Sequence, residues 1–144
     1  MTDSKLGTSK IGPYELLGSL GAGGMAETYL AKKVGPARFE QRVCLKRMLP
    51  SLANDPDLTA LFLQEAQLAA RLRHGNLAQV LDFGEHEGNY YLVLELVEGT
   101  DLRLLLRGLK RTGKELTTGL VAYIAVSIAS GLERAHDEGI VHRD

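Results

Sequence analysis

The feature that constrains this chain most is a cluster of glycines between two segments with strand character. Gly21-Ala22-Gly23-Gly24 follows the strand-like Tyr14–Leu20, and Glu27–Lys32 alternates like a second strand. Glycine has no side chain, so backbone N–H groups in such a loop can approach a phosphate closely. A P-loop would require a following Gly-Lys-Ser/Thr, and a dinucleotide-binding fold would require a helix directly after the glycines. Neither is present, which leaves a glycine-rich hairpin over phosphates or a plain hairpin turn without a ligand.

Two charged side chains lie on faces that are otherwise apolar. Lys46 is in the middle of a predicted strand, on the same face as Cys44 and Met48. Glu65 lies on the apolar face of a predicted helix. Lys46 could reach solvent from an edge strand, and Glu65 could lie at the boundary of the packed face. Taken together with the glycines, the two charges predict an ion pair, because buried-face charges are rarely left unpaired.

The remaining pattern places short strands in the first part of the chain and helices in the second. Asp55 is a plausible N-cap for a helix that begins at Pro56 and ends near Arg71. We expect a disordered tail at 1–10, a first lobe at 11–97 and an incomplete second lobe at 98–144. The other predicted strands and helices are Arg42–Leu49, Ala78–Phe83, Tyr90–Leu96, Leu102–Leu109 and Thr117–Glu138.

Composition excludes several classes of protein. Apolar residues make up 44% of the 144 residues, and the net charge is −1. Such a chain is neither disordered nor generally attracted to nucleic acid. One cysteine excludes an internal disulfide and a multi-cysteine zinc site. With no signal-peptide pattern at Met1–Lys10, and with Leu120–Leu132 too short to span a bilayer, we expect a soluble, cytoplasmic chain without a membrane segment.

In this order, the motifs resemble those of the protein kinase family, and in detail its bacterial serine/threonine branch. They cover about Tyr14 to Asp144. The segments that carry the resemblance are the glycine-rich loop Gly21–Thr28, the lysine strand Val43–Lys46, the helix glutamate in Phe62–Ala66, the linker Arg71–Leu77, the hinge strand Tyr91–Gly99 and the catalytic-loop approach Ala135–Asp144. The resemblance implies an α+β fold: a five-stranded antiparallel sheet with one packed helix, followed by the first helices of a truncated helical lobe.

The resemblance also implies roles for individual residues. Lys46 would hold the α- and β-phosphates of ATP, oriented by Glu65, and Asp144 would accept the proton of the substrate hydroxyl. Leu94 would gate the adenine pocket, whereas the carbonyl of Glu95 and the N–H of Val97 would bond to the base. The residues implied to bind ATP are Leu20, Gly21, Ala22, Gly23, Gly24, Met25, Ala26, Glu27, Thr28, Cys44, Lys46, Leu94, Glu95, Val97 and Asp101.

The chain also departs from the family's pattern. Ala26 replaces the third glycine, Thr28 replaces a valine, Cys44 replaces an alanine and Gly75 replaces a proline. The family's magnesium ligands would follow Asp144, so we expect no metal ligand in this chain and nucleotide binding that is weak and nearly independent of magnesium.

The expected function is transfer of the ATP γ-phosphate to serine or threonine hydroxyls of an unknown protein substrate by the complete domain. The alternative is a catalytically inactive fragment that binds a nucleotide or a partner. Local motifs do not separate serine/threonine from tyrosine specificity. We expect the chain alone to be inactive and to associate, because the missing lobe or a second copy would cover the apolar helix around Leu120–Ala129. A basic run is either a solvated helix face or a docking patch: Arg103, Arg107, Lys110, Arg111 and Lys114.

Overall fold

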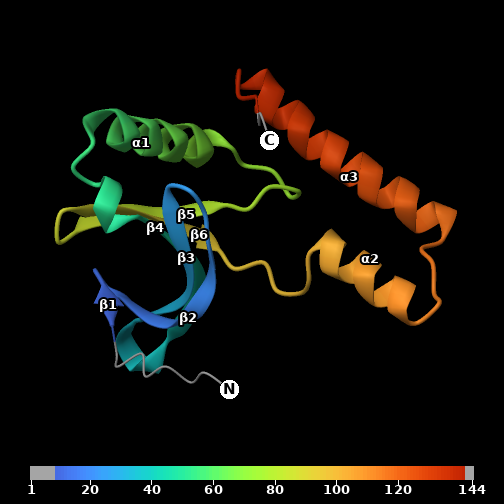
Figure 1. Ribbon diagram of the computed structural model, residues 1–144, viewed down its shortest axis with the longest axis horizontal. Coiled ribbons are helices and arrows are strands. Elements are labelled where there is room, and N and C mark those ends of the chain that lie inside the picture. Colours follow the sequence, from blue (N-terminus) through green and yellow to red (C-terminus); the bar gives the residue numbers. More distant parts are fainter. Residues whose placement is uncertain (1–8, 142–144) are drawn as a thin grey trace. The chain divides into compact units, whose positions relative to one another are not determined.

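The structure is a computed structural model that describes residues 9–141. It divides into two units. The first contains the chain up to Arg71 together with Ala78–Leu96, and the second contains Leu72–Leu77 and the chain from Val97 onward. The first unit holds all six strands and one helix, and the second holds two helices (Figure 1). The expected α+β class is confirmed. Most of the predicted tail at 1–10 lies outside the described residues, although Lys10 begins a strand.

The sheet is antiparallel throughout and has the strand order β1-β2-β3-β4-β6-β5. Its strands are β1 Lys10–Ile11, β2 Tyr14–Ala22, β3 Ala26–Val34, β4 Glu40–Met48, β5 Val80–His86 and β6 Asn89–Glu95. The sheet therefore has six strands rather than the predicted five. The additional strand is β1, which pairs with the start of β2 across a turn where Gly12 takes a φ of +55°. It forms because Ile11 is buried, with only 3% of its surface exposed.

Each helix begins at a side chain that caps its free N–H groups. Helix α1 spans Pro56–Arg71, and Oδ1 of Asp55 accepts from the backbone N–H of Asp57 and of Leu58, which confirms the predicted start. Helix α2 spans Leu102–Arg111 and α3 spans Thr118–Asp137. Their caps are Asp101, which accepts from Leu104 N, and Thr117, which accepts from Leu120 N. Two single 3₁₀ turns, Pro36–Arg38 and Pro50–Leu52, flank β4.

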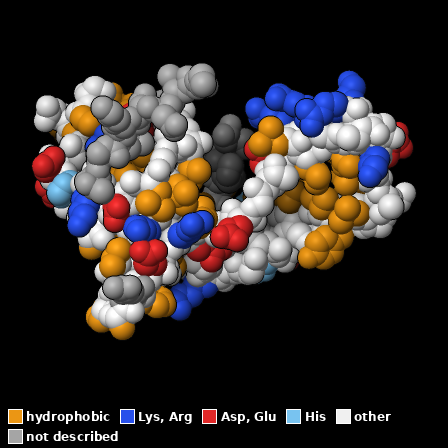
Figure 2. All heavy atoms as spheres, turned by 90° about the horizontal axis from the view of Figure 1, so that it is seen from below, with side chains coloured by type: hydrophobic (Ala, Val, Ile, Leu, Met, Phe, Trp, Pro, Cys, Tyr) orange, Lys and Arg blue, Asp and Glu red, His pale blue; other side chains and the backbone are white. Residues whose placement is uncertain are grey.

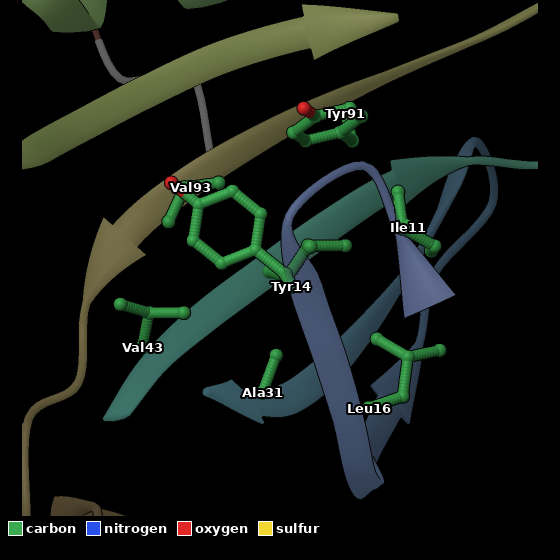
Figure 3. Packing of buried hydrophobic residues seen from close by; sticks show 8 residues of the cluster. Ile11, Tyr14, Leu16, Ala31, Val43, Tyr91 and Val93 are labelled. Atoms are coloured by element: carbon green, nitrogen blue, oxygen red, sulfur yellow. The ribbon is translucent and has the colours of Figure 1, made fainter. Parts of the chain in front are cut away.

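One hydrophobic cluster packs strands β1 to β4 and β6 against each other (Figure 3). The rings of Tyr14 and Tyr91 meet edge to face, with centroids 6.1 Å apart. Val43 and Leu45 of β4 belong to this cluster, as their alternation with Cys44 predicted. The buried members are Ile11, Tyr14, Leu16, Ala31, Val43, Leu45, Tyr91 and Val93.

A second cluster packs α1 against the sheet and fixes the helix over β4. Phe62 and Ala66 of α1 are buried against Met48 and Leu92, together with Ala26. Leu58 packs at the margin of this cluster. Leu61 is also apolar and lies next to Phe62 in the chain, but it is 53% exposed. The helix thus contacts the sheet through Leu58, Phe62 and Ala66, which follow one another at intervals of four residues, and Leu61 lies beside this row.

In the second unit, the linker Leu72–Leu77 packs on α3. The ring of His74 accepts from Asn76 N at Nδ1 (3.2 Å), and its Nε2 lies 3.3 Å from the hydroxyl oxygen of Ser130, within hydrogen-bond distance. A Cβ at Gly131 would lie 3.3 Å from the carbonyl oxygen of Asn76, so a larger residue there would push the linker back by a few tenths of an ångström. Several large apolar side chains of α3 are exposed, among them Tyr123 (69%). None of the helices in the described part of the chain is long and apolar enough to cross a membrane.

Candidate active site

The candidate site in the first unit centres on Lys46 in β4. Lys46 pairs in register with Thr28 of β3 and Leu92 of β6, so its side chain lies on the face that α1 covers. Its Nζ donates to Oε1 of Glu65 over 2.6 Å. The predicted ion pair is therefore confirmed. Both side chains keep contact with solvent, with 28% of Lys46 and 54% of Glu65 exposed.

Phe62 forms the floor beneath this ion pair. The Nζ of Lys46 lies 5.9 Å from the centroid of the Phe62 ring, within cation–π range. Phe62 is 2% exposed and is held in the second cluster, so the ring is a fixed support. The sequence analysis did not include Phe62 among the site residues. The available signal was its spacing, because Phe62 lies one turn before Glu65 on the same side of α1.

The glycine cluster forms the loop between β2 and β3. Gly23 N donates to the carbonyl of Ala26 (2.8 Å), which closes the loop, and Leu49 N donates to the carbonyl of Met25 (2.9 Å), which ties the loop to the end of β4. Gly24 has no other atom within 4 Å of a Cβ position. A cavity of about 430 Å³ opens beside the loop, lined by Gly23, Gly24, Met25, Ala26, Thr28, Lys46, Phe62 and Glu65.

A second group of predicted residues lies two positions along the same strand. Cys44 pairs in register with Leu30 of β3 and with Leu94 of β6, so these side chains share the face that carries Lys46. Leu94 packs against the second cluster. Burial raises the pKa of the Cys44 thiol, and the charge of Lys46 opposes this shift in part. At the end of the strand, Glu95 N donates to the carbonyl of Gln79.

Other predicted site residues lie elsewhere or have other partners. Glu27 does not line the cavity; its Oε2 accepts from the hydroxyl of Tyr29 (2.6 Å) and from Nη2 of Arg47 (3.0 Å), and these bonds lower its pKa. Gly21 and Ala22 belong to β2, and Leu20 is 53% exposed beside a bulge in that strand. Val97 and Asp101 belong to the second unit, where Asp101 caps α2. Asp144 lies outside the described residues.

A metal site would need several oxygen, nitrogen or sulfur ligands converging on one point. Within residues 9–141, no group of three or more His, Cys, Asp or Glu side chains could hold a metal ion. The described residues therefore do not fit a protein-bound magnesium ion. What the cavity offers is one cation held by a carboxylate, next to exposed backbone at a glycine loop, and this arrangement suits a phosphate group.

Comparison with known proteins gives consistent matches. The model of the protein kinase domain matches residues 14–144. The tyrosine-protein kinase MasK of Myxococcus xanthus is 40% identical over 141 residues, which cover 92% of this chain and 22% of that protein. The serine/threonine-protein kinase PknH of Mycobacterium tuberculosis is 39% identical over 142 residues, which cover 99% of this chain and 21% of that protein.

A solved structure matches in the same way. The PknI kinase domain of Mycobacterium tuberculosis superposes with a TM-score of 0.73 at 30% identity, over 98% of this chain and 55% of that one. The chain thus spans about a fifth of the length of the curated relatives described above and about half of the solved domain.

Proposed function

The chain belongs to the protein kinase family, and we propose that it is the nucleotide-binding part of an enzyme that transfers the γ-phosphate of ATP to serine or threonine hydroxyls of a protein. The family as a whole uses ATP and Mg²⁺ and acts on proteins. The finer assignment to serine and threonine is supported by the PknH relative, whereas the MasK relative bears the name of a tyrosine kinase.

The observation that carries the proposal is the ion pair between Lys46 and Glu65 at the wall of a cavity that the glycine loop also lines. Glu65 fixes one direction of the Lys46 ammonium group and leaves its other two protons for an anion. The packed ring of Phe62 limits how far the lysine can move. An arrangement that is fixed before the ligand binds reduces the entropic cost of orienting the phosphates.

Each part of the site has a separate task in this proposal. Lys46 binds the α- and β-phosphates, and the backbone at Gly23 and Gly24 covers them. The face formed by Cys44 and Leu94, with Thr28, receives the adenine ring. Asp144 would hold the substrate hydroxyl and accept its proton. Magnesium bound with ATP would neutralise charge on the phosphates, but the described residues supply no ligand set for it.

Nucleotide binding is the first test. Calorimetric titration of ADP into the chain should show binding that Lys46→Met weakens about tenfold or more, since a charge-assisted contact to phosphate is lost. Lys32→Met is the matched control, because Lys32 also forms an ion pair from the same sheet, with Glu40 at 2.9 Å. Equal affinity in the wild type and in Lys46→Met would contradict the assigned role of Lys46.

Phosphotransfer is the second test and uses a polypeptide that contains this chain. Transfer of labelled γ-phosphate to a mixed protein substrate, followed by identification of the modified residues, should give phosphoserine and phosphothreonine. Phosphotyrosine alone would overturn the assigned specificity. Nucleotide binding without transfer under all conditions would support the alternative of an inactive nucleotide-binding protein.

A further inference from the structure

A hydrogen-bonded cluster of three side chains lies on the face of the sheet that points away from the nucleotide cavity. Oε2 of Glu27 accepts from the hydroxyl of Tyr29 (2.6 Å) and from Nη2 of Arg47 (3.0 Å). The guanidinium carbon of Arg47 lies 5.7 Å from the centroid of the Tyr29 ring, so this cation also packs on the ring. We call Glu27, Tyr29 and Arg47 the outer cluster. The proposed nucleotide site assigns it no task.

The strand register places the outer cluster where it cannot touch a ligand in the cavity. Glu27 and Arg47 pair directly across β3 and β4, and the next pair along the ladder is Thr28 with Lys46. Successive side chains of a strand point to opposite faces of a sheet. Thr28 and Lys46 line the cavity, so their neighbours in the ladder point away from it. Any effect of the outer cluster on a nucleotide must therefore pass through the backbone.

The same register places Glu27 at the base of the glycine loop. Glu27 pairs with Ala22 of β2, and this is the pair of β2 and β3 that lies next to the loop. One row of paired residues thus crosses four strands: Ala22, Glu27, Arg47 and Tyr91. Tyr91 is 6% exposed and belongs to the first hydrophobic cluster, so the row ends in the core. The outer cluster links the base of the loop to this fixed end.

The position of the loop depends on its base. Two backbone hydrogen bonds hold the loop itself, from Gly23 N to the carbonyl of Ala26 and from Leu49 N to the carbonyl of Met25. Gly24 is open to space, since a Cβ there would have no other atom within 4 Å among the described residues. Glycine also has more backbone freedom than other residues. The point where β3 leaves the loop therefore sets where the loop lies over a phosphate.

An ion pair alone would not indicate a functional role. Figure 2 shows acidic and basic side chains next to each other on the visible face of the first unit. Lys32 and Glu40 form such a pair between the same two strands, but near the other end of the hairpin, where Glu40 pairs with Val34. The outer cluster differs in its place at the base of the loop. It also differs in its third member, Tyr29, which packs against the first hydrophobic cluster.

From these observations we propose that the outer cluster positions the glycine loop: it holds the start of β3 against β4, so that the backbone N–H groups of Gly23 and Gly24 stay over the phosphates. Glu27, Tyr29 and Arg47 are then positioning residues that make no contact with the ligand. This inference deepens the proposed function and rests on the cavity being a nucleotide site. Because the cluster acts on the loop, it should matter for a ligand with phosphates and not for adenosine.

The test is calorimetric titration of ADP and of adenosine into the wild type, Glu27→Met and Arg47→Met. Both variants keep the bulk of the side chain and remove its charge. Each should lower ADP affinity about three- to fivefold and change adenosine affinity by less than about 1.5-fold. A direct effect of charge would give opposite signs, because removing an anion strengthens ADP binding whereas removing a cation weakens it. The double variant should lose no more than either single variant, since both side chains act through one contact.

Matched controls come from the other ion pair between the same two strands. Lys32→Met and Glu40→Met remove the same charges and should keep ADP affinity within about 1.5-fold of the wild type. Tyr29→Phe keeps the packed ring and loses only the hydroxyl. It should therefore lower ADP affinity by about twofold, because Glu27 still accepts from Arg47.

Hydrogen exchange of the free chain tests the loop without a nucleotide. The backbone amides of residues 22–28 should exchange about three- to tenfold faster in Glu27→Met and in Arg47→Met than in the wild type, because the base of the loop opens more often. The same amides should be unchanged in Glu40→Met. Mass spectrometry of proteolytic fragments measures these rates.

Several results would overturn the inference. ADP affinity that is unchanged in Glu27→Met and Arg47→Met, or that changes with opposite signs, would leave the loop independent of the cluster. Equal losses for ADP and adenosine would mean that the cluster only stabilises the fold, and unchanged exchange at the loop would mean that it does not hold the loop. If the wild type binds no ADP, the proposed function fails, and the exchange comparison still decides whether the cluster fixes the loop.

Discussion

Lys46 and Glu65 are joined by a 2.6 Å hydrogen bond between Nζ and Oε1, and a second ion pair, between Lys32 and Glu40, spans 2.9 Å on the same sheet. The two pairs have similar chemistry but different surroundings. Lys46 and Glu65 line the cavity next to the glycine loop, whereas Lys32 and Glu40 do not. Comparing them separates what an ion pair does for stability from what it does for a ligand.

The first prediction compares Glu65→Gln with Glu40→Gln. Both variants should change the free energy of unfolding only slightly, because ion pairs open to solvent contribute little. Only Glu65→Gln should lower ADP affinity, by roughly five- to tenfold, since Lys46 then loses the group that orients it. Urea unfolding and calorimetric titration measure the two quantities. An equal loss of affinity in both variants would mean that net charge matters and orientation does not.

The second prediction concerns alkaline stability. The hydroxyl of Tyr14 donates to Oδ2 of Asp82 over 2.6 Å. Burial raises the pKa of Tyr14 above its usual value, and this hydrogen bond raises it further by a smaller amount. The protonated form is thus favoured in the folded state. The protonated Tyr14 contributes fully to the free energy of unfolding below the pKa of an unfolded tyrosine, about 10. This contribution is lost as the pH rises from there toward the pKa of Tyr14 in the folded state.

Tyr14→Phe should therefore lower stability near neutral pH by about 1–2 kcal/mol, the cost of losing a hydrogen bond to a carboxylate. It should also flatten the decline in unfolding free energy above about pH 10. Burial raises the pKa of Tyr29 and Tyr91 as well, so some decline should remain. Tyr123→Phe, at a side chain that is 69% exposed, should keep the wild-type pH dependence. An unchanged alkaline slope in Tyr14→Phe would contradict the account.

The third prediction compares two glycines of the sheet. A Cβ at Gly84 would lie 2.6 Å from Cζ of Tyr91, whose ring is 6% exposed and is packed against Tyr14. Gly84→Ala should lower the free energy of unfolding by about 1–3 kcal/mol, because the ring cannot move without disturbing the core. A Cβ at Gly18 would have no neighbour within 4 Å, so Gly18→Ala should be neutral or stabilising by up to about 1 kcal/mol. Urea unfolding measures both variants, and equal effects would contradict the packing at Tyr91.

Local sequence pattern predicted most of the elements, because each is fixed by residues close to it in the chain. The start of α1 follows from Asp55 and Pro56, which cap the helix and set its first turn. The two faces of β4 follow from strict alternation, which puts Leu45 in one core and Met48 in the other. The ion pair of Lys46 and Glu65 was predictable because each is a charge on an otherwise apolar face.

What the sequence did not reveal depends on contacts between distant residues. The strand β1 has only two residues, too few for alternation to be visible. Glu27 was placed with the ATP-binding loop on the family's pattern, but the register of β3 with β4 sets it opposite Arg47, twenty residues away. No spacing along the chain encodes that register. The exposure of Leu61 likewise depends on how α1 lies on the sheet.

The last prediction tests the assigned adenine face through Cys44, the single cysteine of the chain. Its side chain is half-buried and lies on the same face of β4 as Lys46. Burial raises its pKa, and only the thiolate attacks alkylating reagents. Labelling by iodoacetamide should therefore be slow at neutral pH and should accelerate about tenfold for each pH unit until the pKa is reached.

Nucleotide should protect this thiol if the adenine ring lies on the face of Cys44 and Leu94. Saturating ADP should slow the labelling several-fold, and mass spectrometry of the intact chain measures the rate without ambiguity because one site reacts.

In Lys46→Met the protection should require about tenfold more ADP, since the phosphate contact is lost. In Lys32→Met it should be unchanged. Adenosine should protect wild type and Lys46→Met alike, because it lacks phosphates. If saturating ADP binds yet leaves the labelling rate unchanged, the base does not lie on this face of β4, and only the phosphate part of the assignment would stand.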